Sequence, residues 1–272
     1  MVKEPADPHP DSDEDEDGGP IKSFLEHLED LRWVFIKCLS ALLIGLVACL
    51  AAAPQLLSIL QRPLKQSGAP ITLQIFGPIG SVTVSLKVAL YGGLTLSLPF
   101  ILYFIAQFVV PALKKNEKKY FVRAFIVGTG LFLAGVIMCY FFVLKISLWG
   151  MSQYAAWLGL PAEIWRAEEY FQFVTLFMMG MGVSFEFPVI LLTLVKMGLL
   201  EHRTLVKSRP YLFIIIFSLC AFITPDFIST FFMVIPVLVL MEICILISGH
   251  WERQKRRAAE AEASIEASHQ AR

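Results

Sequence analysis

The sequence predicts an all-α, polytopic membrane protein with six transmembrane helices. Of its 272 residues, 56% are hydrophobic and the mean hydropathy is +0.65, which exceeds what the core of a soluble protein of this size requires. Apolar runs recur along the chain, and each is about 20 residues long, enough for a helix to cross a hydrocarbon core of about 30 Å.

Six apolar runs define the predicted spans. They cover roughly residues 33–53, 83–110, 120–147, 170–197, 210–224 and 229–248, inside a transmembrane domain of residues 21–250. The last two spans are short, and the segment Thr224-Pro225-Asp226-Phe227 leaves little room for a loop between them. We therefore expect a tight hairpin that crosses a thinned or tilted part of the membrane.

Two tails flank the spans. Residues 1–20 contain the acidic run Asp11–Asp17, which predicts a solvated, disordered cytoplasmic tail. Residues 251–272 mix Ala, Glu and Arg, which predicts a cytosolic helix or a frayed end. The first apolar stretch follows an acidic tail and is too long for the apolar part of a cleavable signal peptide, so we expect it to stay in the membrane.

The basic residues predict the orientation. If both termini are cytoplasmic, that side receives 18 of the 23 lysines and arginines. The far side keeps only Arg62, Lys65, Lys87, Lys145 and Arg166. Since cytoplasmic loops of membrane proteins carry an excess of Lys and Arg, we expect both termini in the cytoplasm.

Enzymatic chemistry has few candidate residues in this sequence. None of the five histidines lies within a predicted span, paired intramembrane aspartates are absent, and no G-x-x-x-x-G-K-[ST] motif occurs. The five cysteines fall in or at the edge of apolar runs without a CxxC motif, which indicates small buried hydrophobes. We therefore expect no enzyme, no cofactor, no metal site and no nucleic-acid partner.

Carboxylates at the spans are the informative polar residues. Glu186 and Glu242 fall inside spans, while Asp30 and Glu117 lie where spans meet the cytoplasm. An ionised carboxylate in hydrocarbon costs at least about 2.5 kcal/mol, so Glu186 is a functional candidate. Glu242 is near a span end, and its long side chain could extend to the interface, which favours a structural role.

Four motifs, read in order, resemble those of a known family. They are His27-Leu28-Glu29-Asp30-Leu31-Arg32, Pro111-Ala112-Leu113 followed by Glu117, Gly182-Val183-Ser184-Phe185-Glu186-Phe187-Pro188, and Ile223-Thr224-Pro225-Asp226. Together they are similar to the landmarks of the TatC family, the multispanning receptor subunit of the twin-arginine protein translocase. The resemblance covers about residues 21–250 and leaves out both tails.

The resemblance implies a function. Members of this family bind the twin-arginine signal peptide of folded cargo at the cytoplasmic face. They recruit single-span TatA- and TatB-type subunits for export driven by the proton-motive force. It further implies the bacterial inner membrane, surrounding lipid, a concave, glove-like arrangement of helices, and self-association within a receptor complex.

The resemblance also implies roles for individual residues. Asp30 and Glu117 correspond to the carboxylates that receive the arginine pair, and Glu186 to the intramembrane glutamate that faces the concave cavity and partner subunits. Further implied positions are Arg32 and Phe108 for the signal peptide, Asp226 and Thr230 for partner subunits, and Pro63, Pro99 and Pro188 for structure. This chain has Asp30 where Glu is usual and Thr230 where Gln is frequent.

Binding energy sets a requirement on the peptide site. Two charge-assisted hydrogen bonds of roughly 1.5–3 kcal/mol each fall short of the ~8 kcal/mol that micromolar binding needs. We therefore expect the apolar stretch of the peptide to bind as well, along Phe100, Tyr103, Phe104 and Phe108 of the second span.

Two other classes of protein remain open. A small-solute secondary transporter would use Glu186 as its coupling site, although such sites usually gather several polar groups and broken helices. A purely structural assembly factor would need neither Asp30 nor Glu117. For Glu186 we expect a polar group donated by another subunit's helix, with Gly180 and Gly182 allowing close approach.

Overall fold

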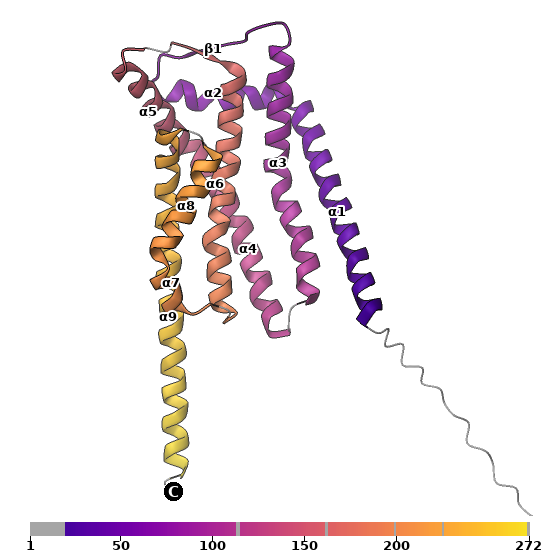
Figure 1. The fold of residues 1–272 in the computed structure, drawn as a ribbon, viewed down its shortest axis with the longest axis vertical. Coiled ribbons are helices and arrows are strands. Elements are labelled where there is room, and N and C mark those ends of the chain that lie inside the picture. Colours follow the sequence, from indigo (N-terminus) through magenta and orange to yellow (C-terminus); the bar gives the residue numbers. More distant parts are fainter. Residues whose placement is uncertain (1–19, 113–114, 161–162, 199, 225, 271–272) are drawn as a thin grey trace, which may run out of the picture.

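The chain forms a bundle of long helices capped at one end by a crosswise helix and a small sheet (Figure 1). The computed structural model describes residues 20–112, 115–160, 163–198, 200–224 and 226–270. We call the end with α2, β1 and β2 the sheet end. The opposite end, with α7, the start of α1 and the α3–α4 connection, is called the α7 end.

The long helices confirm the apolar runs as helical segments. Within the described ranges, five helices are long and apolar enough to cross a membrane, and a sixth apolar helix is shorter. They are α1 (Pro20–Ala51), α3 (Gly80–Val109), the continuous stretch of α4 (Lys115–Met138), η2 (Cys139–Val143) and α5 (Leu144–Trp157), α6 (Ala167–Lys196), and α9 (Phe227–Gln270), with α8 (Arg209–Ile223) as the short one.

Only one of the two final spans is short, which corrects the sequence-based prediction. Helix α8 has 15 residues, whereas α9 has 44 and contains a candidate span of 28 residues, Phe227–Gln254. The apolar run continues directly into Ala, Glu and Arg, which favour helix, so nothing in the sequence ends α9 at the membrane surface. The tail after residue 250 therefore continues α9 to Gln270, while the acidic run lies outside the described residues.

Helix α2 (Ala53–Gln66) was not predicted and lies across the sheet end, where it runs from the end of α1 past α3 and α6 toward α5 (Figure 1). Its leucines at positions 56, 57, 60 and 64 recur at helical spacing and pack on the core. Pro63 lies inside this helix and is buried. Because proline has no N–H, the carbonyl of Ile59 loses its helical donor, and the hydroxyl of Tyr140 donates to that oxygen instead, at 3.0 Å.

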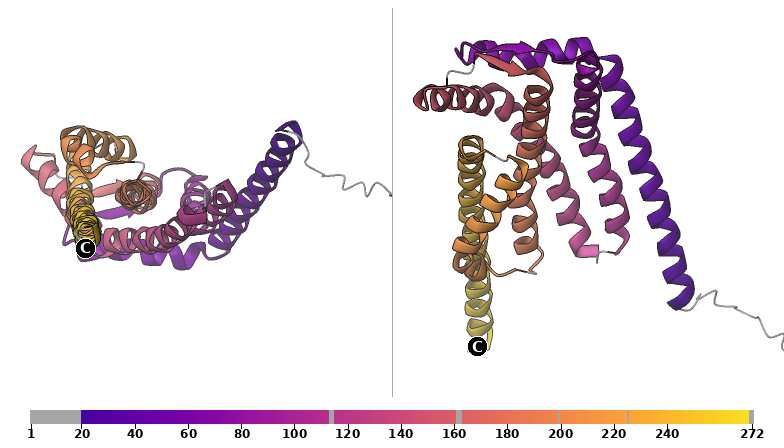
Figure 2. Two further views of the ribbon diagram at one scale, coloured as in Figure 1. Left: turned by 90° about the horizontal axis from the view of Figure 1, so that it is seen from below. Right: turned by 45° about the horizontal axis from the view of Figure 1, so that its top comes forward.

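A small sheet corrects the all-α prediction. Strand β1 (Thr72–Gln74) pairs in parallel with β2 (Ile164–Arg166), with Leu73 opposite Trp165. Figure 2 shows this pair at the sheet end, beside α2. Three residues are too few to show a periodic pattern, and the partner strand is far away in sequence, so local patterns could not predict the pairing.

Helix α1 lies at the edge of the molecule and packs on α3 through glycines (Figure 2). A Cβ added to Gly93 would lie 2.8 Å from both the Cα and the N of Leu46. In the same contact, Ser97 donates a hydrogen bond of 2.8 Å to the carbonyl of Ala41. Small residues therefore let the two backbones approach closely.

The core is built around α6, with buried side chains from α2, α3, η2, α5, α8 and α9 packed against it. Its largest fully buried side chains include Phe177, Leu144, Met181 and Met233. Pro99 and Pro188, the other two prolines expected to be structural, lie inside α3 and α6.

Candidate functional site

The two predicted arginine-binding acids belong to helices that both begin at the α7 end. Asp30 lies on α1, two residues into the candidate span that starts at Leu28, and its side chain is exposed. Arg32, on the same helix, is also exposed. Glu117 lies in the first turn of α4, but its side chain falls outside the described part of the structure. Helix α4 begins and α1 starts at the same end of the bundle (Figure 1).

Aromatic side chains cover the half of α3 that leads to this end. Phe100 and Tyr103 are 58% and 52% exposed, and Phe108 is half-buried. The Tyr103 ring lies 5.7 Å from Phe104 and 6.2 Å from Phe125 of α4, centroid to centroid. The apolar surface predicted from the sequence is therefore present on the outside of α3.

Glu186 lies on α6, ten residues before Lys196 at the helix end, or about 15 Å at the helical rise per residue. Its carboxyl group faces α4 at Gly128, where an added Cβ would lie 2.6 Å from Oε2. The other oxygen, Oε1, is buried without a hydrogen-bond partner among the described residues. A buried polar atom of this kind calls for a partner.

The glycines near Glu186 serve contacts inside the chain. A Cβ on Gly182 would lie 2.6 Å from the ring of Phe132 on α4. On Gly180 it would lie 2.3 Å from the side chain of Ile223 on α8. The close approach predicted for another subunit's helix is therefore made by helices of the same chain.

Asp226 and Thr230 shape the turn between α8 and α9. Asp226 accepts a hydrogen bond of 2.6 Å from the backbone N–H of Ser229 through Oδ2, so it caps the N-terminus of α9. The Thr230 hydroxyl lies 2.8 Å from that of Thr224 and 2.7 Å from the carbonyl of Asp226. Thr230 is only 3% exposed, so its hydroxyl makes its hydrogen bonds inside the turn.

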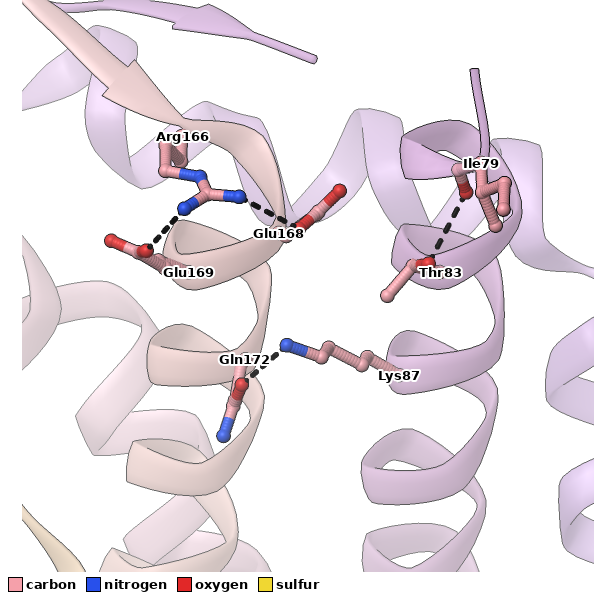
Figure 3. Close-up of polar contacts among 7 residues, drawn as sticks. All are labelled: Ile79, Thr83, Lys87, Arg166, Glu168, Glu169 and Gln172. Carbon is pink, nitrogen blue, oxygen red and sulfur yellow. Dashed lines mark hydrogen bonds and ion pairs between the residues drawn. The ribbon is translucent and has the colours of Figure 1, made fainter. Parts of the chain in front are cut away.

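A polar cluster at the sheet end was not identified from the sequence (Figure 3). Lys87 of α3 donates a 2.7 Å hydrogen bond to Oε1 of Gln172 on α6. One turn closer to the sheet, Arg166 lies 3.6 Å from Glu168 and 3.5 Å from Glu169. Both glutamates lie in the first turn of α6, where the helix dipole favours negative charge.

The comparison with known families decides the family to which the chain belongs. The sequence profile described as "Sec-independent protein translocase protein (TatC)" matches residues 26–236. The chain belongs to the TatC family. It is therefore a multi-pass membrane component of a protein translocase, and the resemblance of the four motifs is confirmed.

Two TatC relatives give the extent of the similarity. The Sec-independent protein translocase protein TatC of Akkermansia muciniphila is 35% identical over 200 residues, which are 73% of this chain and 57% of that protein. The chain thus spans a little over half of that relative's length. The TatC of Carboxydothermus hydrogenoformans is 32% identical over 83% of this chain and 92% of its own length.

The TatC fold is shared with a solved structure. A crystal structure of the twin-arginine translocase receptor TatC superposes with a TM-score of 0.72 at 30% identity and covers 82% of this chain and 99% of the other. TatC membership favours protein translocation over the small-solute transporter that the sequence left open.

Proposed function

We propose that this chain is the core receptor subunit of a twin-arginine translocase, which binds the twin-arginine signal peptide of folded cargo. The observation that carries the proposal is Asp30, which is exposed at the α7 end and forms no ion pair with any described residue. Glu117 lies in the first turn of α4, which begins at the same end. Two arginines in tandem require two carboxylates on adjacent elements, since each guanidinium offers a planar fork of donors.

The apolar face of α3 supplies the remaining affinity in this proposal. Exposed ion pairs contribute about 0–1 kcal/mol each, which is too little for stable binding. The exposed rings of Phe100 and Tyr103, followed by Phe108, offer an apolar surface that starts near the acids and runs toward mid-membrane. Arg32 lies on the same face of the membrane and would orient the peptide beside Asp30.

The proposed setting is the bacterial inner membrane. The distribution of 18 of 23 basic residues supports cytoplasmic termini and therefore a cytoplasmic α7 end. In this setting α8 completes six spans, the helices enclose a concave, glove-like face, and copies of the chain associate within the receptor complex.

Recruitment of single-span TatA- and TatB-type subunits is the second part of the proposal. Glu186 supports it because Oε1 is buried without a donor among the described residues, and Gly128, which faces the carboxyl group from α4, has no side chain that could donate. A polar side chain on a partner helix would satisfy that oxygen. Asp226 contributes to this partner site by capping the N-terminus of α9, and Thr230 contributes by hydrogen bonds that stabilise the turn between α8 and α9.

Cross-linking of a twin-arginine peptide tests the receptor function. We expect Asp30→Ala combined with Glu117→Ala to abolish cross-linking while the complex still assembles. Glu29→Ala is the matched control, since Glu29 is an exposed acid on the same helix. Undiminished cross-linking in the double variant would refute the assignment, and solute flux into liposomes from this chain alone would favour a transporter.

Glu186→Ala tests the partner contact separately. We expect it to impair co-purification of the single-span subunits and to leave peptide cross-linking intact. Loss of both activities together would indicate that Glu186 supports the fold rather than a partner.

A further inference from the structure

A second polar site lies at the α7 end, in a half-open cavity of about 1020 Å³. Its walls come from four elements: the first part of α4, the end of α6, α7 (His202–Lys207) and α9. Tyr120, Lys196, Glu201, His202, Trp251 and Glu252 are among the lining residues. The peptide site proposed above does not use this cavity.

The cavity holds a cation of the chain itself between aromatic rings. The Nζ of Lys196 lies 3.9 Å from the ring centroid of Trp251 and 5.6 Å from that of Tyr120. Lys196 is nevertheless exposed, and Tyr120 is 38% exposed. An exposed cation–π contact changes an equilibrium constant by only about two- to fivefold, so another cation can displace this lysine.

A hydrogen bond joins two of the elements that line the cavity. The Nδ1 of His202 lies 2.8 Å from the hydroxyl of Ser248, which ties α7 to α9. Gly249 allows this contact, because a Cβ at that position would lie 3.0 Å from Cε1 of His202. The α7 and α9 walls of the cavity are therefore held together.

The aromatic rings favour a cationic occupant. They already hold the Nζ of Lys196, and the charged lining includes Glu201 and Glu252 as well as Lys196 and Arg203. Tyr120 lies three residues after Glu117 on α4, a rise of about 4.5 Å along the helix. An extended peptide advances about 3.3 Å per residue, so a basic residue two to four positions from the arginine pair reaches the cavity.

We propose that this cavity binds a further basic side chain of the signal peptide, and that Lys196 occupies the site until the peptide displaces it. The inference rests on the receptor function proposed above. Signal peptides carry a positively charged segment ahead of their apolar stretch, which supplies the residue required. Lys196 thus acts as an internal competitor, so binding selects peptides with basic residues beyond the arginine pair.

The test uses the full chain in lipid nanodiscs and two labelled synthetic peptides. Both contain the arginine pair, and one has a flanking lysine where the other has glutamine. We expect the wild type to prefer the lysine peptide, and Lys196→Gln to tighten the binding of that peptide alone by about two- to fivefold. Trp251→Leu should abolish the preference. The controls are Lys207→Gln, a nearby exposed lysine on α7, and Trp157→Leu, 78% exposed at the sheet end.

Several outcomes would overturn the inference. Equal effects of Lys196→Gln and Lys207→Gln would indicate general charge repulsion, and weaker binding of both peptides by Lys196→Gln would indicate a structural lysine. An effect that occurs only in nanodiscs with anionic lipid would assign the cavity to a phospholipid headgroup. If peptides with the arginine pair replaced by glutamines bind as well as the originals, the receptor proposal itself fails.

Discussion

The contact between α1 and α3 allows a specific prediction, because two adjacent glycines on α3 differ in the space available for a side chain. A Cβ on Gly93 would lie 2.8 Å from the Cα and N of Leu46 and 2.9 Å from the carbonyl carbon of Gly45. All of these are backbone atoms of α1, so no side chain can rotate away. On Gly92 the nearest atom is the sulfur of Cys49 at 3.6 Å, an ordinary contact.

Gly93→Ala therefore forces the two helices apart. Carbon atoms pack at about 3.5–4.0 Å, so α1 must move by roughly 1 Å. Overpacking of this kind costs about 1–3 kcal/mol. At about 2–4 °C per kcal/mol for a domain of this size, the midpoint of thermal unfolding in detergent should fall by roughly 2–12 °C.

Gly92→Ala is the matched control. Both substitutions remove one glycine from the same helix, so both gain the same helix propensity, and the control should leave the midpoint unchanged or raise it slightly. The midpoint is measured by heating the detergent-solubilised protein and following the monodisperse fraction by size-exclusion chromatography. Equal midpoints for the two variants would refute the close packing of α1 on α3.

Substitutions at three hydrogen bonds test each bond by thermal unfolding. Tyr140→Phe removes the donor to the Ile59 carbonyl and should cost about 1 kcal/mol; no change in midpoint would mean that water replaces the hydroxyl. Asp226→Ala removes the cap of α9 and should cost about 0.5–2 kcal/mol, while Asp226→Asn should retain most of the stability. Lys87→Met should destabilise by about 1–3 kcal/mol because Oε1 of Gln172 loses its donor. Adding Gln172→Leu should restore part of the loss, and strict additivity of the two changes would contradict the contact.

The long helices could be predicted because their signal is local. A run of apolar residues identifies a spanning helix wherever it occurs, and α1, α3, α6 and α9 all follow such runs. Helix α2 was not predicted because only one face of it is apolar and it is too short to cross the membrane, so it has no continuous apolar run. The helix predicted after residue 250 is confirmed as a continuation of α9, because the change from apolar to charged residues marks the membrane surface, not a helix terminus.

Some residues of the candidate site could likewise be identified from local sequence, and others could not. Asp30, Glu117 and Glu186 could be identified because each belongs to a local motif or contrasts with its apolar neighbours. Lys87 with Gln172, and Lys196 with Trp251, could not, since each pair joins residues on different helices that are far apart in sequence. The role of Gly182 was misassigned for a related reason: helical spacing gives the face of α6 on which a glycine lies but not the helix opposite that face.

The packing of α4 on α6 bears directly on Glu186. Because Gly128 lies against Oε2, that position of α4 has no side chain that could donate a hydrogen bond to the carboxyl group. The next residue, Thr129, has a hydroxyl that is also buried without a partner among the residues described. Among the described residues, two buried oxygens on adjacent helices are thus left without a partner, and in the apolar interior of a membrane each unsatisfied group costs several kcal/mol. Gly128 brings α4 close to α6 but supplies no hydrogen-bond donor to the Glu186 carboxyl group. A donor from a helix other than α4 and α6 is therefore favoured, and a partner subunit's helix would supply it.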